Sequence, residues 1–241
     1  MNKIDSFWYQ ILHPDRHSSA FIWFILLGLV IIVVAIVPEF IQINNVSNVL
    51  IQMVPLGLVS LGQGLVILGG GIDLSVGSQI SLITLIAANT MTDSPVIIIL
   101  SLFLCLGAGV VFGTLNGLLV HKMNIPPLIV TLCTSFIFQG LAYTLHKTTG
   151  GYIPSSFQMS LTISWGLFSI PFLLFLSFIG IEFYLLYRTR FGRYIYALGG
   201  NEEVLANAGV SVGKIKVTTY VIAGLMAAIT GLYLAARVKS G

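Results

Sequence analysis

Seven apolar stretches, most of them close to the length of a bilayer-crossing helix, alternate with polar segments along the chain. A helix needs about 20 apolar residues to cross the hydrocarbon core, and only helices and closed barrels pair all of their backbone groups there. We therefore predict an all-α fold, a polytopic transmembrane helical bundle that forms a single domain over residues 1–241. The expected spans, about seven, cover residues 20–37, 46–68, 75–91, 96–120, 128–145, 165–187 and 217–236. The third stretch is the shortest and predicts a short or broken helix.

The scarcity of charge argues against an ordinary soluble domain. Charged residues make up 8% of the chain and hydrophobic residues 56%, whereas soluble proteins carry about 25% charge. The net charge of +3 is spread over several polar segments, so we expect no nucleic-acid partner. The two cysteines, Cys105 and Cys133, lie inside apolar stretches without metal-ligand spacing, and we expect no metal site.

Basic residues are distributed unevenly among the predicted connections, which indicates an orientation. With seven spans and a cytoplasmic N-terminus, eight basic residues lie inside, and only Lys147, Arg237 and Lys239 lie outside. This asymmetry follows the positive-inside rule. We therefore expect the N-terminal tail, residues 1–19, in the cytoplasm. Within this tail, residues 4–12 fit either an amphipathic helix on the membrane surface or a disordered segment.

One long polar segment, residues 188–216, holds seven of the nineteen charged residues. Such a segment must lie in water, and the same basic asymmetry places it in the cytoplasm. Its sequence predicts one short helix over residues 202–208. Asn201 suits the N-cap, the two glutamates that follow it complement the helix dipole, and Gly209 suits the C-terminal stop.

This predicted helix has an apolar face, formed by Val204, Leu205 and Ala208. An apolar face on a solvated helix must be covered by another surface. Two alternatives remain open from the sequence: the helix docks on a partner, or it folds back on the membrane body.

Small residues recur at four-residue spacing in two of the predicted spans. In lipid, hydrophobic burial does not drive helices together, and small residues on one face let two backbones approach closely. We expect these residues to pack helices rather than to act chemically. They are Gly109, Gly113 and Gly117 in one span, and Ala223, Ala227, Gly231 and Ala235 in the last.

A glycine-rich segment, residues 69–78, separates the second and third spans. We expect Asp73 to cap the helix that follows, with Ser75 and Ser78 near its start. Two interpretations stay open. The segment is a broken helix whose polar groups line a path, or it is a tight turn at the membrane face.

No catalytic motif is present, so we do not expect an enzyme. Residues 209–215 approach a phosphate loop but are one residue short and lack the Ser or Thr that holds magnesium. Two classes of transporter remain. An ion- or proton-coupled secondary transporter needs ionisable groups inside its spans, and only Glu182 and Asp73 qualify. An ATP-driven permease needs none, because its energy enters through a cytoplasmic loop.

Three motifs in sequence order resemble the ribose-type permeases of ATP-binding-cassette (ABC) importers. The first is Gly-Gly-Gly-Ile-Asp-Leu-Ser-Val-Gly-Ser at residues 69–78. The second combines Asn-Gly at 116–117, Ile-Pro-Pro at 125–127 and Thr-Leu at 131–132. The third, Thr-Arg-Phe-Gly-Arg, begins at residue 189 and continues through the polar segment to Val210. Together the motifs cover most of the chain after about residue 45.

The resemblance implies a non-catalytic membrane subunit of a bacterial inner-membrane importer. ATP and magnesium would be bound by a separate ABC ATPase. The other implied partners are a periplasmic sugar-binding protein and a second permease chain, in a homodimer or a heterodimer. The polar segment would be the coupling loop that docks on the ATPase, with these residues carrying the contact: Arg190, Gly192, Arg193, Gly199, Gly200, Asn201, Glu202, Glu203, Leu205, Ala208 and Gly209.

The substrate implied by the resemblance is a monosaccharide such as ribose, xylose or a related sugar. Sugars are bound through hydrogen bonds to their hydroxyl groups, so polar residues in or near the spans are the candidates. We expect these residues to lie along the path: Gln52, Gln63, Asp73, Ser75, Asn89, Asn116, Thr131 and Gln139. Ribose-type permeases continue with further spans beyond the point that matches residue 241, so we expect this chain to be truncated relative to them.

Overall fold

The computed structural model describes residues 18–123, 125–145, 151–165 and 168–238. Its elements are α2 (Ser18–Ile36), η1 (Pro38–Ile41), α3 (Ile43–Leu68), α4 (Val76–Thr90), α5 (Pro95–Lys122), α6 (Pro127–Leu145), α7 (Ser155–Thr162), β1 (Ser164–Trp165), β2 (Phe168–Ser169), α8 (Ile170–Arg188), α9 (Arg190–Gly200), α10 (Glu202–Asn207) and α11 (Val212–Val238). The all-α class is confirmed. The described residues contain only one strand pair, the short antiparallel β1 and β2. The prediction for residues 4–12 lies outside the described residues.

An apolar helix lies at each of the seven predicted spans, and five are long enough to cross a membrane. These five are α3, α5, α6, α8 and α11. The helix α4 has 15 residues, or about 22 Å at about 1.5 Å per residue, which is shorter than a hydrocarbon core of about 30 Å. The prediction of a short helix at this position is confirmed. The described apolar part of α2, Ile22–Ile36, is also shorter than a regular span, so seven is an approximate count.

The chain divides into two units, residues 1–49 and 50–241. In the first unit, α2 ends just before Pro38, the first residue of η1. The side-chain amide of Asn45 donates a hydrogen bond of 2.8 Å to the carbonyl of Phe40 and ties η1 to the start of α3. The rest of the architecture concerns the second unit.

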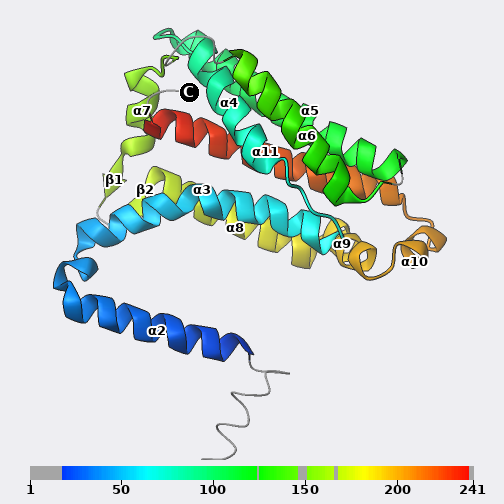
Figure 1. Ribbon diagram of the computed structural model, residues 1–241, viewed down its shortest axis with the longest axis horizontal. Helices are drawn as coiled ribbons and strands as arrows, with labels where there is room; N and C mark the ends of the chain where they lie inside the picture. The colour runs from blue at the N-terminus through cyan, green and yellow to red at the C-terminus, as the bar shows by residue number, and fades with distance from the viewer. Residues whose placement is uncertain (1–17, 124, 146–150, 166–167, 239–241) are drawn as a thin grey trace, which may run out of the picture. The chain divides into compact units, whose positions relative to one another are not determined.

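The helix α11 lies at the centre of the second unit and packs along α5 (Figure 1). The predicted glycine face of α5 makes this contact. A methyl group at Gly109 would lie 2.5 Å from the carbonyl oxygen of Gly224, and one at Gly113 would collide with the carbonyl of Tyr220. At Gly117 a methyl group would approach the Cα of Val217 to 2.7 Å. The two backbones therefore touch, as the spacing predicts.

Small residues of α11 also meet other helices. A methyl group on Gly231 would lie 2.8 Å from the side chain of Ile83 in α4, and one on Gly62 of α3 would lie 2.9 Å from Ala223. Ala227 is fully buried. Ala223 and Gly231 thus lie at contacts of α11 with two different neighbours, α3 and α4.

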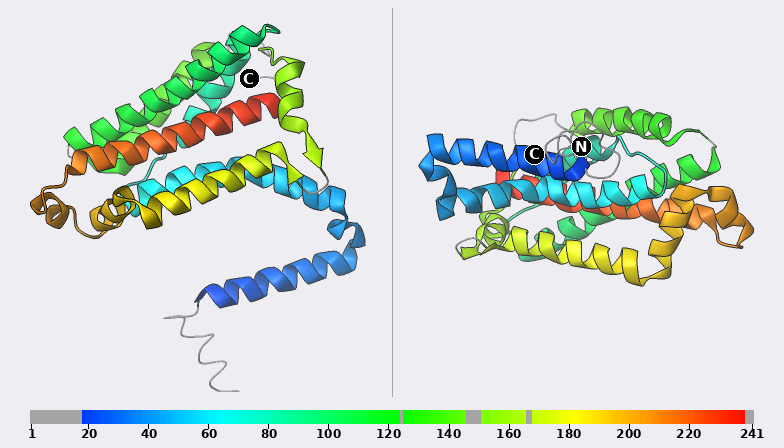
Figure 2. Two further views of the ribbon diagram at one scale, coloured as in Figure 1. Left: turned by 180° about the vertical axis from the view of Figure 1, so that it is seen from behind. Right: turned by 90° about the horizontal axis from the view of Figure 1, so that it is seen from below.

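The helix α7 lies at the end of the bundle opposite to α9 and α10 (Figures 1 and 2). The sequence pattern did not predict it, because its eight residues are too few for an apolar period to stand out. The segment before it is anchored on α4, since the amide of Tyr152 donates to the carbonyl of Ala88 at 2.9 Å. Its neighbours Ile153 and Phe157 are buried in the same core as Ala88.

We predict that Gly113→Ala destabilises the protein although alanine favours a helix. One methyl group would collide with the Tyr220 carbonyl, and overpacking of this kind costs about 1 to 3 kcal/mol. The matched control is Gly107→Ala on the same helix, where nothing lies within 4 Å and helix propensity alone favours the change. Thermal unfolding in detergent should show a lower midpoint for the first variant only. Equal midpoints would mean that α5 and α11 do not touch here.

Candidate functional site

The polar segment folds into two helices, α9 and α10, where one helix was predicted. Thr189 makes the sharp turn from α8 into α9. Its hydroxyl donates to the carbonyl of Leu185 at 2.6 Å and accepts from the amide of Gly192 at 3.3 Å. Gly192 lies against the backbone of Leu186, where a side chain would collide. Its close packing, rather than flexibility, explains the need for glycine at this position.

The helix α9 is a correction, because the sequence predicted only one short helix in this segment, over residues 202–208. Ile195 and Leu198 are three positions apart and both buried, and this spacing was the available signal. Gly199 and Gly200, which the sequence analysis listed among the coupling-loop residues, are the last residues of α9.

The helix α10 is confirmed close to its predicted bounds. The Asn201 side-chain oxygen accepts hydrogen bonds from the amides of Glu203 at 2.9 Å and Val204 at 3.1 Å. Gly209 has a φ of 76°, the left-handed conformation expected of a residue that ends a helix. Asn201 therefore caps the start of α10 and Gly209 follows its end, as predicted.

The predicted apolar face of α10 is split between the loop's interior and solvent. Leu205 is 5% exposed and packs with Leu198 and Val212 in a small core of the loop itself. Val204 is 63% exposed and Ala208 is also exposed. Leu205 thus holds the loop together, and Val204 is the large apolar residue that α10 presents outward.

The end of α9 lies directly against the turn between α3 and α4. A side chain on Gly199 would collide with the carbonyl of Leu68, and Gly70 approaches the Cα of Gly199. Gly70 has a φ of 78°, which only glycine adopts without strain. The glycine-rich segment at residues 69–78 and the glycine pair at residues 199–200 are far apart in sequence. They nevertheless meet in one backbone contact.

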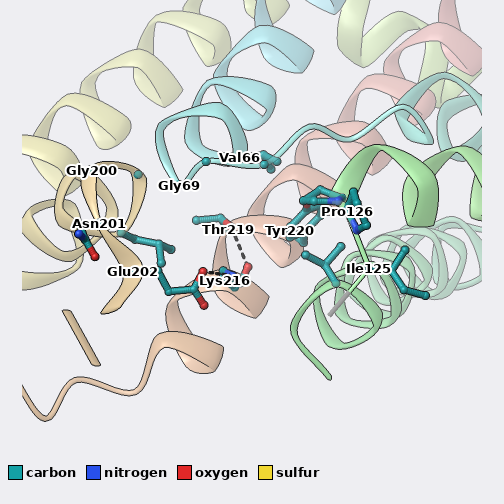
Figure 3. A pocket seen from close by; sticks show the side chains of 16 residues that line it. Val66, Gly69, Ile125, Pro126, Gly200, Asn201, Glu202, Lys216, Thr219 and Tyr220 are labelled. Atoms are coloured by element: carbon teal, nitrogen blue, oxygen red, sulfur yellow. Dashed lines mark hydrogen bonds and ion pairs between the residues drawn. The ribbon is translucent and has the colours of Figure 1, made fainter. Parts of the chain in front are cut away.

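A cleft of about 490 Å³ lies beside this contact. Its walls come from the α3–α4 turn, the α5–α6 turn at Ile125 and Pro126, and the start of α10 (Figure 3). Lys216 of α11 forms an ion pair of 2.6 Å with Glu202 across it. This pair fastens α10 to α11, although an exposed pair contributes only about 0 to 1 kcal/mol.

Behind the turn, Asp73 is buried in a cluster of polar side chains. One of its oxygens accepts from the amide of Ser75 at 2.8 Å and from its hydroxyl at 2.6 Å. The Ser75 hydroxyl in turn accepts from the side-chain amides of Gln79 and Asn116, both at 2.7 Å. Longer contacts of 3.4 and 3.5 Å join those two amides to the Asp73 carboxyl. We call these four residues the polar cluster.

The polar cluster joins three segments of the chain. Asp73 lies in the connection between α3 and α4, outside both helices, and Asn116 lies in α5. Burial raises the pKa of the Asp73 carboxyl, and the hydrogen bonds from Ser75, Asn116 and Gln79 partly oppose that shift. Ser75, rather than Asp73, occupies the N-cap position of α4, so the predicted cap is displaced by two residues. The connection is a turn held by buried polar contacts.

Thr131 and Tyr220 hold the same connection from two further helices. The Thr131 hydroxyl accepts from the amide of Leu74 at 3.1 Å, and the Tyr220 hydroxyl donates to the carbonyl of Ile72 at 3.5 Å. Four predicted path residues thus come together: Asp73, Ser75, Asn116 and Thr131. Gln79 and Tyr220 were missed, although Gln79 lies one helical turn after Ser75 in an otherwise apolar stretch.

The other predicted path residues lie elsewhere. Gln52 and Asn89 are exposed, and Gln63 and Gln139 are partly buried. Asn89 donates only to the carbonyl of Leu85 in its own helix. The side-chain oxygen of Gln63 is buried without a hydrogen-bond partner in the described part of the chain. None of these four shares a hydrogen bond with the polar cluster among the described residues.

We predict that Asn116→Ala lowers the thermal stability of the protein in detergent. The change removes one of the two side-chain amides that donate to Ser75 and Asp73, and losing such a hydrogen bond costs about 0.5 to 1.5 kcal/mol. Asn89→Ala is the matched control, because Asn89 is exposed and such changes usually stay within about 0.5 kcal/mol. Equal unfolding midpoints for the two variants would show that the polar cluster does not stabilise the fold.

Comparison with known proteins identifies relatives over most of the chain. The family profile described as branched-chain amino acid transport system / permease component matches residues 45–241. The ribose import permease protein RbsC of Escherichia coli strain K12 is 36% identical over 224 residues, which are 89% of this chain and 68% of that protein. RbsC of Bacillus subtilis strain 168 is 38% identical over 220 residues, 88% of this chain and 66% of that protein.

A third relative is the galactose/methyl galactoside import permease protein MglC of Escherichia coli strain K12. It is 30% identical over 240 residues, 91% of this chain and 71% of that protein. No solved structure matches. The family profile covers more than half of the chain, and it includes the glycine-rich turn, the polar cluster and the α9–α10 loop. The chain therefore belongs to this family of membrane permease components of transport systems.

Proposed function

We propose that this chain is the membrane-spanning permease subunit of an ABC importer for a monosaccharide. Family membership gives the permease class, and the relatives named for ribose and galactose import support a sugar as substrate. Energy would come from ATP and magnesium on a separate ATPase subunit. The family match favours this function over an ion- or proton-coupled secondary transporter.

The main support for this proposal is the packing of the α9–α10 loop. The loop has a small core of its own around Leu205, and Gly199 joins it to the turn between α3 and α4. A force applied to such a loop is transmitted to the spans, because a packed unit moves as one body. A coupling element needs this property.

The outer face of the loop supports an ATPase as its partner. Val204 is exposed there, and Arg190 and Arg193 are exposed without an acidic partner among the described residues. Arginines in this state can pair with carboxylates on another subunit. We place this face and the N-terminus in the cytoplasm, from the distribution of basic residues.

The remaining partners follow from the same proposal. A periplasmic sugar-binding protein would deliver the sugar at the opposite end of the bundle, and a second permease chain would complete the pathway. The polar cluster would then hold the inner ends of α4 and α5. Direct contact between the sugar and Gln52, Gln63, Asn89 or Gln139 stays a prediction.

The experiment is reconstitution of the chain in liposomes with the ATPase and binding protein of its own system. We predict uptake of ribose or galactose that requires ATP and persists when ion gradients are collapsed. Uptake that follows an imposed proton or sodium gradient without ATP would contradict the proposal.

Within this system, Val204→Asp tests the docking face. The change places a charge on the exposed apolar residue of α10, so the ATPase should co-purify less well while membrane insertion stays normal. Ser211→Asp is the control, since it adds the same charge at an exposed position of the loop without removing apolar surface. If both variants retain the ATPase as well as the parent chain does, α10 is not the docking element.

A further inference from the structure

A second cleft, of about 470 Å³, lies where α5 ends and α11 begins. Leu118 and His121 of α5 line one side of it, and Lys214, Val217 and Thr218 of α11 line the other. It shares no lining residue with the cleft beside the Lys216–Glu202 ion pair. The proposed coupling function makes no use of it.

This second cleft carries positive charge that no described residue balances. Lys214 is exposed at its edge, and His121 and the adjacent Lys122 are exposed at the end of α5. No aspartate or glutamate is among its lining residues. The only ion pair in the described part of the chain is the one between Lys216 and Glu202. The cleft therefore suits an anion.

Its position corresponds to the headgroup level of a bilayer. The helix α5 has 28 residues and is about 42 Å long at about 1.5 Å per residue. A bilayer including its headgroups is about 40 to 45 Å thick. When α5 spans a bilayer, this length brings its last residues, His121 and Lys122, to the level of the lipid phosphates.

An exposed apolar stripe leads away from the charged end of α5. Val111, Leu115 and Leu118 are 54%, 46% and 36% exposed. Their spacing of four and three residues places them on one helix face, and Lys122 follows at four more. A phospholipid has this same order of groups, a charged phosphate followed by an acyl chain, whereas a soluble anion would use only the cations.

We propose that this cleft binds the headgroup of an anionic phospholipid. Lys214 in the cleft binds the phosphate, His121 lines the site, Lys122 adds positive charge at the adjoining end of α5, and an acyl chain lies along Val111, Leu115 and Leu118. The inference requires only that the chain spans a membrane, so it does not depend on the sugar or on the ATPase.

The test is a native mass-spectrometry titration of the full chain, purified in detergent, with phosphatidylglycerol and with phosphatidylcholine. The parent should bind phosphatidylglycerol more tightly. Lys214→Gln should weaken that binding about fivefold, the contribution typical of one basic residue near anionic lipid. Lys214→Arg should preserve it. Arg237→Gln, which removes one exposed charge at the other end of α11, should leave the affinity nearly unchanged.

Three outcomes would overturn the proposal. The first is equal affinity for the two lipids. The second is equal weakening by Lys214→Gln and Arg237→Gln, which would show that net charge, and not this cleft, attracts the lipid. The third is displacement of phosphatidylglycerol by inorganic phosphate at the same concentration, which would identify a site for a soluble anion. Circular dichroism confirms that each variant is folded before the titration.

Discussion

The structure depends on direct backbone contact between α5 and α11. Inside a bilayer, covering apolar side chains gains little, because lipid is as apolar as another helix, so packing must supply the attraction. Gly109, Gly113 and Gly117 have no side chains, so nothing holds the two helices apart at these positions. The same helix α11 meets α4 through Gly231 and α3 through Ala223. One helix with small residues on several faces thus organises the second unit.

The helix α11 also links the solvent-exposed loop to the buried polar cluster. At its start, Val212 packs with Leu198 and Leu205 of the loop, and Lys216 pairs with Glu202. One turn further on, the Tyr220 hydroxyl donates to the carbonyl of Ile72, next to Asp73. Gly199 adds a second route through the α3–α4 turn. The loop and the turn are therefore connected by packed atoms at two places, which a mechanical coupling element requires.

Structural features that depend on residues close together in the sequence were predicted well. The spans follow from apolar length, the glycine face of α5 from four-residue spacing, and the α10 cap from Asn201 beside two glutamates. Features set by distant partners were not. The helix α9 was not predicted, because the backbone that Gly192 meets at Leu186 and the backbone that Gly199 meets at Leu68 are not visible in the local pattern. Leu205 appeared to be a docking residue because its partners Leu198 and Val212 lie in separate helices. For the same reason, Gln79 was missing from the predicted path residues until the structure placed it beside Ser75.

We propose that the α9–α10 loop transmits force to the spans through the contact of Gly199 with the α3–α4 turn. Two adjacent glycines allow a direct measurement, because a methyl group at Gly199 would collide with the Leu68 carbonyl, whereas nothing lies within 4 Å of one at Gly200. ATP-driven sugar uptake should be measured for Gly199→Ala and Gly200→Ala in complexes that retain the ATPase. Gly199→Ala should lose uptake while ATP hydrolysis continues, and Gly200→Ala should keep both. Equal uptake by the two variants would show that this contact does not transmit force.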